Sequence, residues 1–151
     1  MAKKVAIVLG SKSDMEYIEG AKEILDEFGI TYDVLVMSAH RTLDKVVEFS
    51  RNAEENGFGV IIACAGMAAH LPGVLAAKTH LPVIGVPLPT SDIRGIDALL
   101  AIVQMPSGVP VATMAIGRAG VKNAAILSAQ ILALEDADIR TKLKKYKESL
   151  V

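Results

Sequence analysis

Two short polar segments of the chain combine residue types that can bind a phosphate ester and move a proton. Residues 38–42 read Ser-Ala-His-Arg-Thr and follow an apolar run. An arginine guanidinium donates hydrogen bonds in two directions, which suits a phosphate, and a histidine side chain changes protonation state near neutral pH. We therefore interpret Arg41 as a phosphate ligand and His40 as a general acid and base. The alternative is that Thr42 caps the next helix and that both side chains lie on the surface.

The other segment, residues 10–14, reads Gly-Ser-Lys-Ser-Asp. Gly10 permits a tight turn, and the hydroxyls of Ser11 and Ser13, with the free N–H groups of a helix start, suit an oxyanion. Asp14 would repel a phosphate and is better suited to accept hydrogen bonds from sugar hydroxyls. A capping box formed by Ser13 and Glu16 is the structural alternative. Because the P-loop and dinucleotide-fingerprint spacings are missing, a nucleoside triphosphate or NAD is not expected.

A third segment, residues 65–73, reads Ala-Gly-Met-Ala-Ala-His-Leu-Pro-Gly. Its small residues allow a planar ligand to lie against the backbone. His70 either donates to a carboxylate or bonds within its own loop, and the sequence leaves both open. The 3 histidines of the chain are dispersed and lack metal-ligand spacing, and no nucleophile elbow is present. With no metal, cofactor or covalent nucleophile expected, proton transfer by His40 remains, which contributes about 10²–10⁴-fold to a rate.

Apolar runs typical of buried parallel strands alternate with amphipathic helical patterns. The order predicts an α/β fold, with a parallel sheet, right-handed crossovers and helices on both faces. Ligands bind outside the carboxyl ends of such strands, where residues 10–14, 38–42, 65–72 and 87–91 should converge. The expected strands are 4–9, 31–37, 59–65, 82–87 and 111–115, and the expected helices are 15–28, 43–53, 68–78, 96–103, 121–134 and, facing solvent, 139–151.

Composition excludes several kinds of partner. The 151 residues predict one domain, 1–151. With 16 Lys and Arg against 17 Asp and Glu, the chain has no broad basic face for nucleic acid or an anionic membrane. The single cysteine, Cys64, lies in an apolar run and is expected to be a buried hydrophobic residue. Neither a secretory signal nor a clean span of about 20 apolar residues is visible, so we expect a cytoplasmic protein.

One helical segment is apolar nearly all round. In residues 121–134, ten of the fourteen residues are apolar and they do not form a single stripe. A helix of this kind is buried nearly all round. We therefore expect other copies of the chain to cover it in a homo-oligomer. The alternative is that it lies deep within one copy, under the C-terminal segment.

Together, the segments at 10–14, 38–42, 65–73 and 104–113 closely resemble the N5-carboxyaminoimidazole ribonucleotide mutases. These are the class I aminoimidazole ribonucleotide carboxylases of purine biosynthesis. The resemblance implies a three-layer αβα sandwich with a parallel, flavodoxin-like sheet, and an octamer with its sites at subunit interfaces. It also implies a ribonucleotide substrate and no metal, ATP or biotin. The carboxylate moves from the exocyclic nitrogen to ring carbon 4, through carbon dioxide held in a closed site.

The resemblance also assigns roles to individual residues. His40 is implied to be the general acid and base that moves the proton on and off the ring. The residues implied to bind substrate are Ser11, Ser13, Asp14, Ser38 and Arg41, toward the ribose phosphate, and Gly66, Ala68, Ala69, His70 and Leu71, in the loop over the carboxylate and carbon dioxide.

Two positions depart from the family's usual pattern. Leu43 replaces a common proline, and Met67 replaces a glycine or another small residue. The related class II enzymes carboxylate aminoimidazole ribonucleotide directly and have Arg-Ser-Asn after Ala-Gly in the third loop, where this chain has Met-Ala-Ala-His. This difference favours class I. A non-catalytic nucleotide-binding module is the alternative from another class; it would need the phosphate site but not His40.

Overall fold

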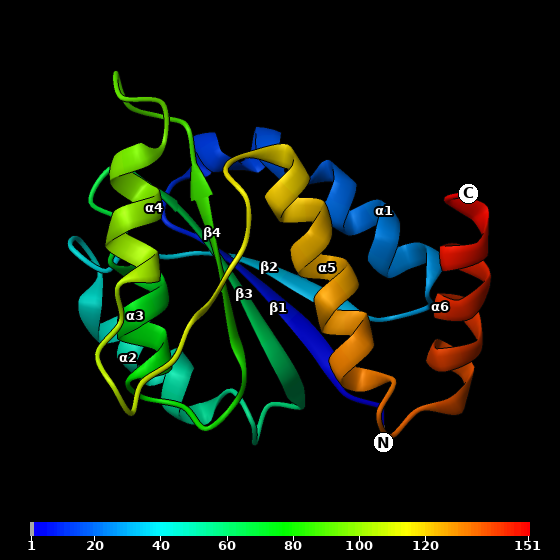
Figure 1. Ribbon diagram of the computed structural model, residues 1–151. Helices are drawn as coiled ribbons and strands as arrows, with labels where there is room; N and C mark the ends of the chain where they lie inside the picture. The colour runs from blue at the N-terminus through cyan, green and yellow to red at the C-terminus, as the bar shows by residue number, and fades with distance from the viewer. Residues whose placement is uncertain (1) are drawn as a thin grey trace.

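The computed structural model, which describes residues 2–151, contains a five-stranded parallel sheet with helices on both faces (Figure 1). The strand order is β2-β1-β3-β4-β5, and every neighbouring pair is parallel. This is the flavodoxin-like arrangement, whose order reverses between β1 and β3. The expected α/β class and three-layer sandwich are confirmed. The strands are β1 Lys4–Leu9, β2 Tyr32–Val36, β3 Phe58–Gly66, β4 Val83–Leu88 and β5 Ala112–Thr113.

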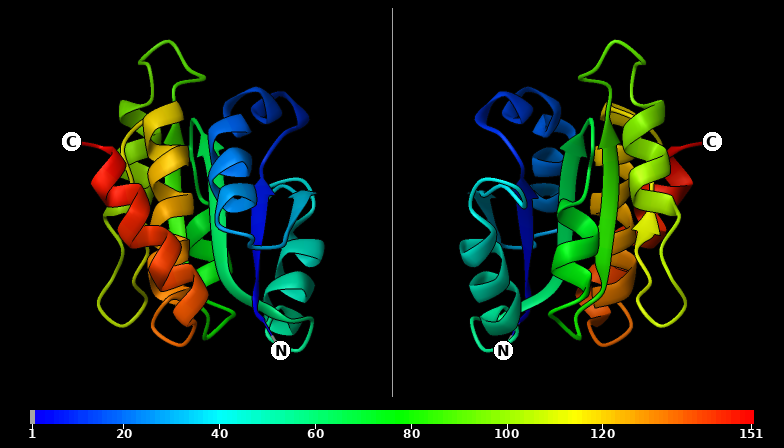
Figure 2. Two further views of the ribbon diagram at one scale, coloured as in Figure 1. Left: turned by 90° about the vertical axis from the view of Figure 1, so that its right-hand side faces the viewer. Right: turned by 90° about the vertical axis from the view of Figure 1, so that its left-hand side faces the viewer.

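The helices divide into two groups, one on each face of the sheet. Figure 2 shows α1 and α5 covering one face, with α6 packed outside α5, and α2, α3 and α4 covering the other. No helix within residues 2–151 has the length and apolar content needed to cross a bilayer. The helices are η1 Lys12–Tyr17 (a 3-10 helix), α1 Glu19–Glu27, α2 Leu43–Asn52, α3 Leu71–Ala76, α4 Ile96–Val103, α5 Arg118–Leu132 and α6 Ala137–Ser149.

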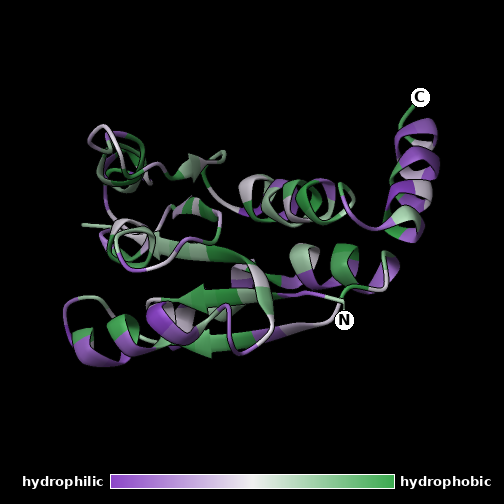
Figure 3. Cartoon of the chain, turned by 90° about the horizontal axis from the view of Figure 1, so that it is seen from below, coloured by the Kyte–Doolittle hydropathy of each residue, from purple (hydrophilic) through white to green (hydrophobic). Residues whose placement is uncertain are grey.

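The central strands β1, β3 and β4 are apolar on both faces of the sheet because their residues alternate between two hydrophobic cores. In β1, Val5, Ile7 and Leu9 pack toward α1 and α5, whereas Ala6 and Val8 pack toward the opposite helices. All five are fully buried. Coloured by hydropathy, the strands are largely hydrophobic and α6 largely hydrophilic (Figure 3), so α6 is the solvent-facing helix that the sequence predicts. A sheet buried on both faces leaves only its strand ends to present polar groups.

Most expected elements differ from the structure by one to three residues at their ends; the helices expected over 121–134 and 139–151, for example, are Arg118–Leu132 and Ala137–Ser149. In three other elements the difference is larger or has a local cause. The helix expected over 15–28 is two helices, because a 3-10 turn ends at Tyr17 and α1 begins at Glu19. The helix expected over 68–78 begins only at Leu71, since residues 67–70 make tight turns. The strand expected over 111–115 pairs at only two residues, Ala112 and Thr113. It follows Pro110, which has no N–H to donate to a ladder.

Helix α5 is covered largely within its own chain. It packs against α1, α6 and the sheet, and its small residues Ala124, Ala125 and Ala129 are fully buried there. Helix α6 is held in place by Lys142, whose ammonium donates to the Phe28 carbonyl at the end of α1. The apolar character of α5 therefore agrees with the alternative interpretation, a helix under the C-terminal segment. By itself, α5 does not require other subunits.

Candidate active site at the carboxyl ends of the strands

A cleft of about 610 Å³ opens at the carboxyl ends of β1, β2, β3 and β4. The strand order reverses between β1 and β3, so the loops after these two strands leave in opposite directions and leave a crevice between them. The cleft is lined by Gly10, Ser11, Ser13, Asp14, Ser38, Ala39, His40, Arg41, Ala65, Gly66, Met67, Ala68, His70, Leu71 and Thr90. Three of the predicted segments thus meet, and the fourth contributes Thr90.

The loop after β1 is organised by a capping box, but not by the residues that the sequence suggests. The Ser11 hydroxyl accepts from the Ser13 N–H at 3.4 Å, and the Asp14 carboxylate accepts from the Ser11 N–H at 3.1 Å. The box is therefore Ser11–Asp14, and the structural alternative, a box formed by Ser13 and Glu16, is wrong. The hydroxyls of Ser11 and Ser13 lie 3.0 Å apart. Both serine side chains line the cleft and are able to donate to an oxyanion there.

In the loop after β2, Ser38 is the organising residue. Its hydroxyl accepts from the backbone N–H groups of His40 and Arg41, at 3.3 and 3.1 Å. Its own N–H donates to the Thr42 hydroxyl at 2.8 Å. Thr42 is the N-cap residue of α2, but its side chain hydrogen-bonds Ser38 and makes no cap on the helix. His40 and Arg41 are exposed, as the alternative expects, and both line the cleft. Because these bonds use the Ser38 hydroxyl, its clearest contribution is to position His40 and Arg41.

The loop after β3 makes two tight turns before α3 begins. The N–H of Ala69 donates to the Met67 carbonyl at 2.9 Å, and the N–H of His70 donates to the Ala68 carbonyl at 2.8 Å. Met67 has a φ of +55°, a left-handed conformation uncommon for a non-glycine residue. Its side chain is 60% exposed at the mouth of the cleft. Met67, which replaces the family's usual glycine or small residue, therefore points its side chain toward solvent and does not close the cleft.

His40 and His70 meet across the cleft, from the loops of two strands that are not neighbours. The Nε2 atom of His40 lies 2.8 Å from Nδ1 of His70, and the rings are edge to face at 82°. Neutral imidazole has one donor and one acceptor nitrogen, so one ring donates and the other accepts. The sequence left two roles open for His70, a carboxylate contact or a bond within its own loop. Its ring contacts His40 and not its own loop, and the carboxylate contact stays a prediction.

Arg41 and Asp14 set the charge at the other end of the cleft. The Arg41 guanidinium donates to the Gly10 carbonyl at 3.3 Å, which joins the β1 and β2 loops. Asp14 is only 5% exposed. Burial raises the pKa of the Asp14 carboxyl above its ordinary value, although the Ser11 N–H and the positive charge of Arg41 oppose this rise. The guanidinium is exposed, so its remaining N–H groups are available to a phosphate.

Of the predicted site residues, only Ala69 lies outside the lining of the cleft. Its side chain is 1% exposed and packs in the core below the loop. Thr90 lines the cleft but was not among the predicted site residues. The available signal was its position just after a buried strand, within the segment 87–91 that the fold places at this edge. Its residue type alone carries no distinctive chemistry.

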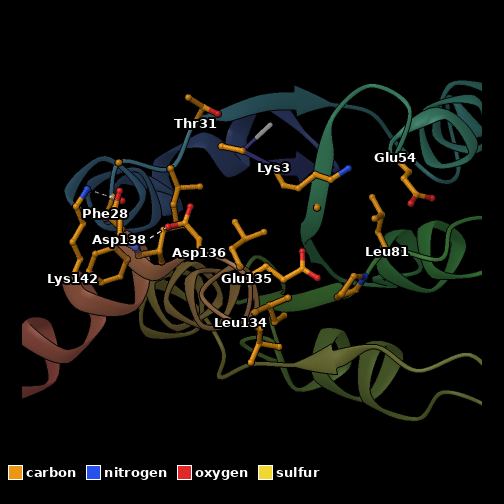
Figure 4. A pocket seen from close by; sticks show the side chains of 18 residues that line it. Lys3, Phe28, Thr31, Glu54, Leu81, Leu134, Glu135, Asp136, Asp138 and Lys142 are labelled. Atoms are coloured by element: carbon orange, nitrogen blue, oxygen red, sulfur yellow. Dashed lines mark hydrogen bonds between the residues drawn. The ribbon is translucent and has the colours of Figure 1, made fainter.

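A second cavity, of about 560 Å³, lies among residues near the amino ends of the strands and the start of α6 (Figure 4). Two charged side chains that line it, Asp136 and Lys142, already hydrogen-bond to the backbone and so stabilise the fold. The Asp136 carboxylate caps α6 by accepting from the N–H groups of Asp138 and Ile139. Lys142 donates to the Phe28 carbonyl. Across residues 2–151, no cluster of three or more His, Cys, Asp or Glu side chains is arranged to hold a metal ion.

A parallel flavodoxin-like sheet with a polar cleft at its switch point defines an α/β protein that binds a small ligand at the strand ends. The family model described as AIR carboxylase matches residues 4–151, and the chain belongs to this family. It is 56% identical to the "N5-carboxyaminoimidazole ribonucleotide mutase" of Thermotoga maritima over 147 residues, which are 97% of this chain and 85% of that protein. The Escherichia coli K12 protein of the same name is 52% identical over 146 residues, 97% of this chain and 86% of that one.

The fold also matches a solved structure of the same kind. The crystal structure of Treponema denticola PurE superimposes with a TM-score of 0.87 at 33% identity, covering 97% of this chain and 90% of that chain. The flavodoxin-like architecture is therefore shared along nearly the whole chain.

Proposed function

We propose that this enzyme converts N5-carboxyaminoimidazole ribonucleotide to 4-carboxy-5-aminoimidazole ribonucleotide in purine biosynthesis. The relatives named for this activity cover 97% of the chain at 50–56% identity. The structural observation that carries the proposal is the presence of His40 and Arg41 in one cleft, beside the serines of the β1 loop. A proton-transfer group thus lies beside a phosphate site.

The reaction needs one group that both gives and accepts a proton. When the nitrogen–carbon bond breaks, its electron pair returns to the exocyclic nitrogen, which takes a proton, and carbon dioxide is released. Ring carbon 4 then forms a bond to that carbon dioxide and loses its own proton. Protonated His40 can supply the first proton and, once neutral, accept the second. Atoms and charge then balance within one substrate molecule, and catalysis rests on proton transfer and positioning.

The cleft suggests how the nucleotide lies. The phosphate end is assigned to Arg41 with the hydroxyls of Ser11 and Ser13, because these are the donors at that end. Asp14 accepts hydrogen bonds from ribose hydroxyls and stays clear of the phosphate. The imidazole then lies toward His40, and the carboxylate lies under the loop from Gly66 to Leu71. In this loop, Ala69 contributes to packing below the surface.

We further propose that the chain works as a homo-oligomer, as an octamer with its sites between subunits. The support within the chain is an apolar face on α4 and the loop before it, where Ile93, Ile96, Leu100 and Val103 are 61%, 52%, 56% and 45% exposed. Ile96, Leu100 and Val103 are spaced by four and three residues, which places them on one side of α4, and Ile93 lies in the loop before the helix. Contiguous exposed apolar surface of this kind marks an interaction site.

A cytoplasmic location is part of the same proposal. The substrate is a phosphorylated intermediate of a biosynthetic pathway, and the only cysteine, Cys64, is buried as a free thiol. Reduced cysteines are usual in the cytosol.

The test is to supply purified enzyme with each of two substrates. N5-carboxyaminoimidazole ribonucleotide alone should be converted to the 4-carboxy product. Aminoimidazole ribonucleotide with carbon dioxide at physiological concentration should give little product on the same time scale. Efficient carboxylation of the second substrate would favour the class II reaction instead. Binding of the nucleotides without turnover of either would favour a non-catalytic module.

A further inference from the structure

Thr90 is a polar residue of the cleft whose position is set by the backbone of a neighbouring strand. It follows β4, and β3 pairs with β4 so that Gly66 lies opposite Leu88. A Cβ atom placed on Gly66 would lie 1.8 Å from the Thr90 hydroxyl oxygen and 3.1 Å from its Cβ. The threonine side chain therefore occupies the space that glycine leaves, and Gly66 is needed there for a steric reason.

The Thr90 hydroxyl is free to bind a ligand. Its residue is exposed and lines the cleft together with His40, Gly66 and His70. Among the hydrogen bonds formed within residues 2–151, none uses the Thr90 hydroxyl. The hydroxyls of Ser38 and Thr42, by contrast, are already bonded within their own loop. A hydroxyl group both donates and accepts, and this one rests against the loop that is proposed to cover the carboxylate.

Strand order indicates which part of the substrate Thr90 meets. The cleft runs along the strand ends in the order β2, β1, β3, β4. Arg41 follows β2, at the opposite end of this row from Thr90. If Arg41 binds the phosphate, the substrate group farthest from the phosphate, which is the carboxylated end of the imidazole, lies toward β3 and β4.

We infer that Thr90 is a further substrate-binding residue, whose hydroxyl donates to the migrating carboxyl group. This inference rests on the proposed mutase function. The carboxylate oxygens accept this hydrogen bond before the nitrogen–carbon bond breaks and again after the bond to carbon 4 forms. In the interval, the same donor remains beside an oxygen of carbon dioxide. The residue therefore favours recapture of carbon dioxide by carbon 4 over its escape, and takes no part in proton transfer.

The experiment replaces Thr90 with valine, which has nearly the same shape but no hydroxyl. Purified oligomer is given N5-carboxyaminoimidazole ribonucleotide, and two nucleotides are measured against a blank without enzyme: the 4-carboxy product and free aminoimidazole ribonucleotide. For Thr90→Val we expect kcat/KM to fall about tenfold, the scale for losing a hydrogen bond to a charged group. We also expect the ratio of free aminoimidazole ribonucleotide to product to rise several-fold. Thr90→Ser should restore both values toward wild type.

Thr141→Val is the matched control, because Thr141 is exposed on α6, far along the chain from the cleft. It should leave both values unchanged, and thermal melting checks that every variant folds. If Thr90→Val keeps the wild-type rate and ratio, the inference is overturned while the mutase function stands. A slower Thr90→Val that releases no additional aminoimidazole ribonucleotide would also overturn it, since a purely structural role predicts that result. Absence of turnover in the wild-type enzyme would overturn the proposed function and this inference together.

Discussion

Nε2 of His40 and Nδ1 of His70 are 2.8 Å apart, although the two residues belong to the loops of strands separated by β1. A hydrogen bond needs one donor and one acceptor, so only one of these two nitrogen atoms carries a proton at the contact. The two imidazoles therefore cannot both be in the protonated form, which donates from both nitrogens. A proton held by His40 at Nε2 therefore points toward His70 until a substrate enters. The contact keeps the His40 ring directed into the cleft, where the proposed reaction needs it.

Replacing His40 with asparagine should separate binding from chemistry. Asparagine keeps polar atoms at the position but cannot exchange a proton near neutral pH. We expect kcat to fall by about 10²–10⁴-fold, the usual contribution of a general acid or base, while nucleotide binding changes only a few-fold. Steady-state kinetics and calorimetry measure the two quantities. His80→Asn, at an exposed residue outside the cleft, is the control. Unchanged turnover in His40→Asn would remove His40 from the mechanism.

Replacing Arg41 with alanine should mainly weaken binding. The guanidinium is proposed to make charged hydrogen bonds to the phosphate, each contributing about 1.5–3 kcal/mol, so KM should rise roughly 10–100-fold. A smaller change in kcat is expected because the Arg41 side chain does not contact the reacting bonds. Arg51→Ala, on the exposed surface of α2, tests for a general effect of charge. If Arg41→Ala binds product nucleotide as tightly as wild type, Arg41 is not the phosphate ligand.

The buried carboxyl of Asp14 should make stability depend on pH. Burial raises the pKa of Asp14 in the folded state above its ordinary value of 3.8, so the folded protein binds this proton more tightly than the unfolded chain does. The contribution of Asp14 to stability is therefore most favourable below that value and declines as pH rises through the folded-state pKa. At neutral pH the buried charge is destabilising.

Asp14→Asn tests this relationship, because the amide oxygen can still accept from the Ser11 N–H while the charge is lost. We expect a higher Tm than wild type at pH 7 and a smaller decline in Tm from acidic to neutral pH, measured by thermal unfolding. Glu48→Gln, at an exposed position on α2, should leave the pH dependence unchanged. A lower Tm for Asp14→Asn at pH 7 would contradict the argument. Substrate binding by this variant should also weaken if Asp14 accepts from the ribose.

Replacing Leu100 with glutamate tests the apolar face of α4. A charge at the middle of an interface between copies would have to be desolvated without a partner. We expect the assembly to dissociate in analytical ultracentrifugation and activity to fall with it, because the sites are proposed to lie between subunits. Leu150→Glu places the same change at another exposed leucine, near the C-terminus, and should have no effect on assembly. An unchanged assembly in Leu100→Glu would exclude this face as the interface.

Local patterns were sufficient to predict the elements but not their ends. The alternation of apolar strands and amphipathic helices predicts all five strands and the edge of the sheet where the candidate cleft lies. The break between η1 and α1 and the late start of α3 at Leu71 were not predicted. Both depend on backbone hydrogen bonds in the loops, such as the one from the Ala69 N–H to the Met67 carbonyl. Side-chain periodicity does not report those bonds.

What the sequence alone determined is which chemistry is present: a histidine and an arginine side by side, two serines after a strand, and a small-residue loop. These follow from residue type and from the position of each segment after an apolar run. Only the tertiary structure decided that His70 contacts His40, that Ser38 and Thr42 serve their own loop, and that Thr90 joins the cleft. These relationships connect residues far apart in the chain or depend on loop conformation. They are set when parallel pairing and crossovers bring the strand ends together, and no spacing along the sequence encodes the distances between them.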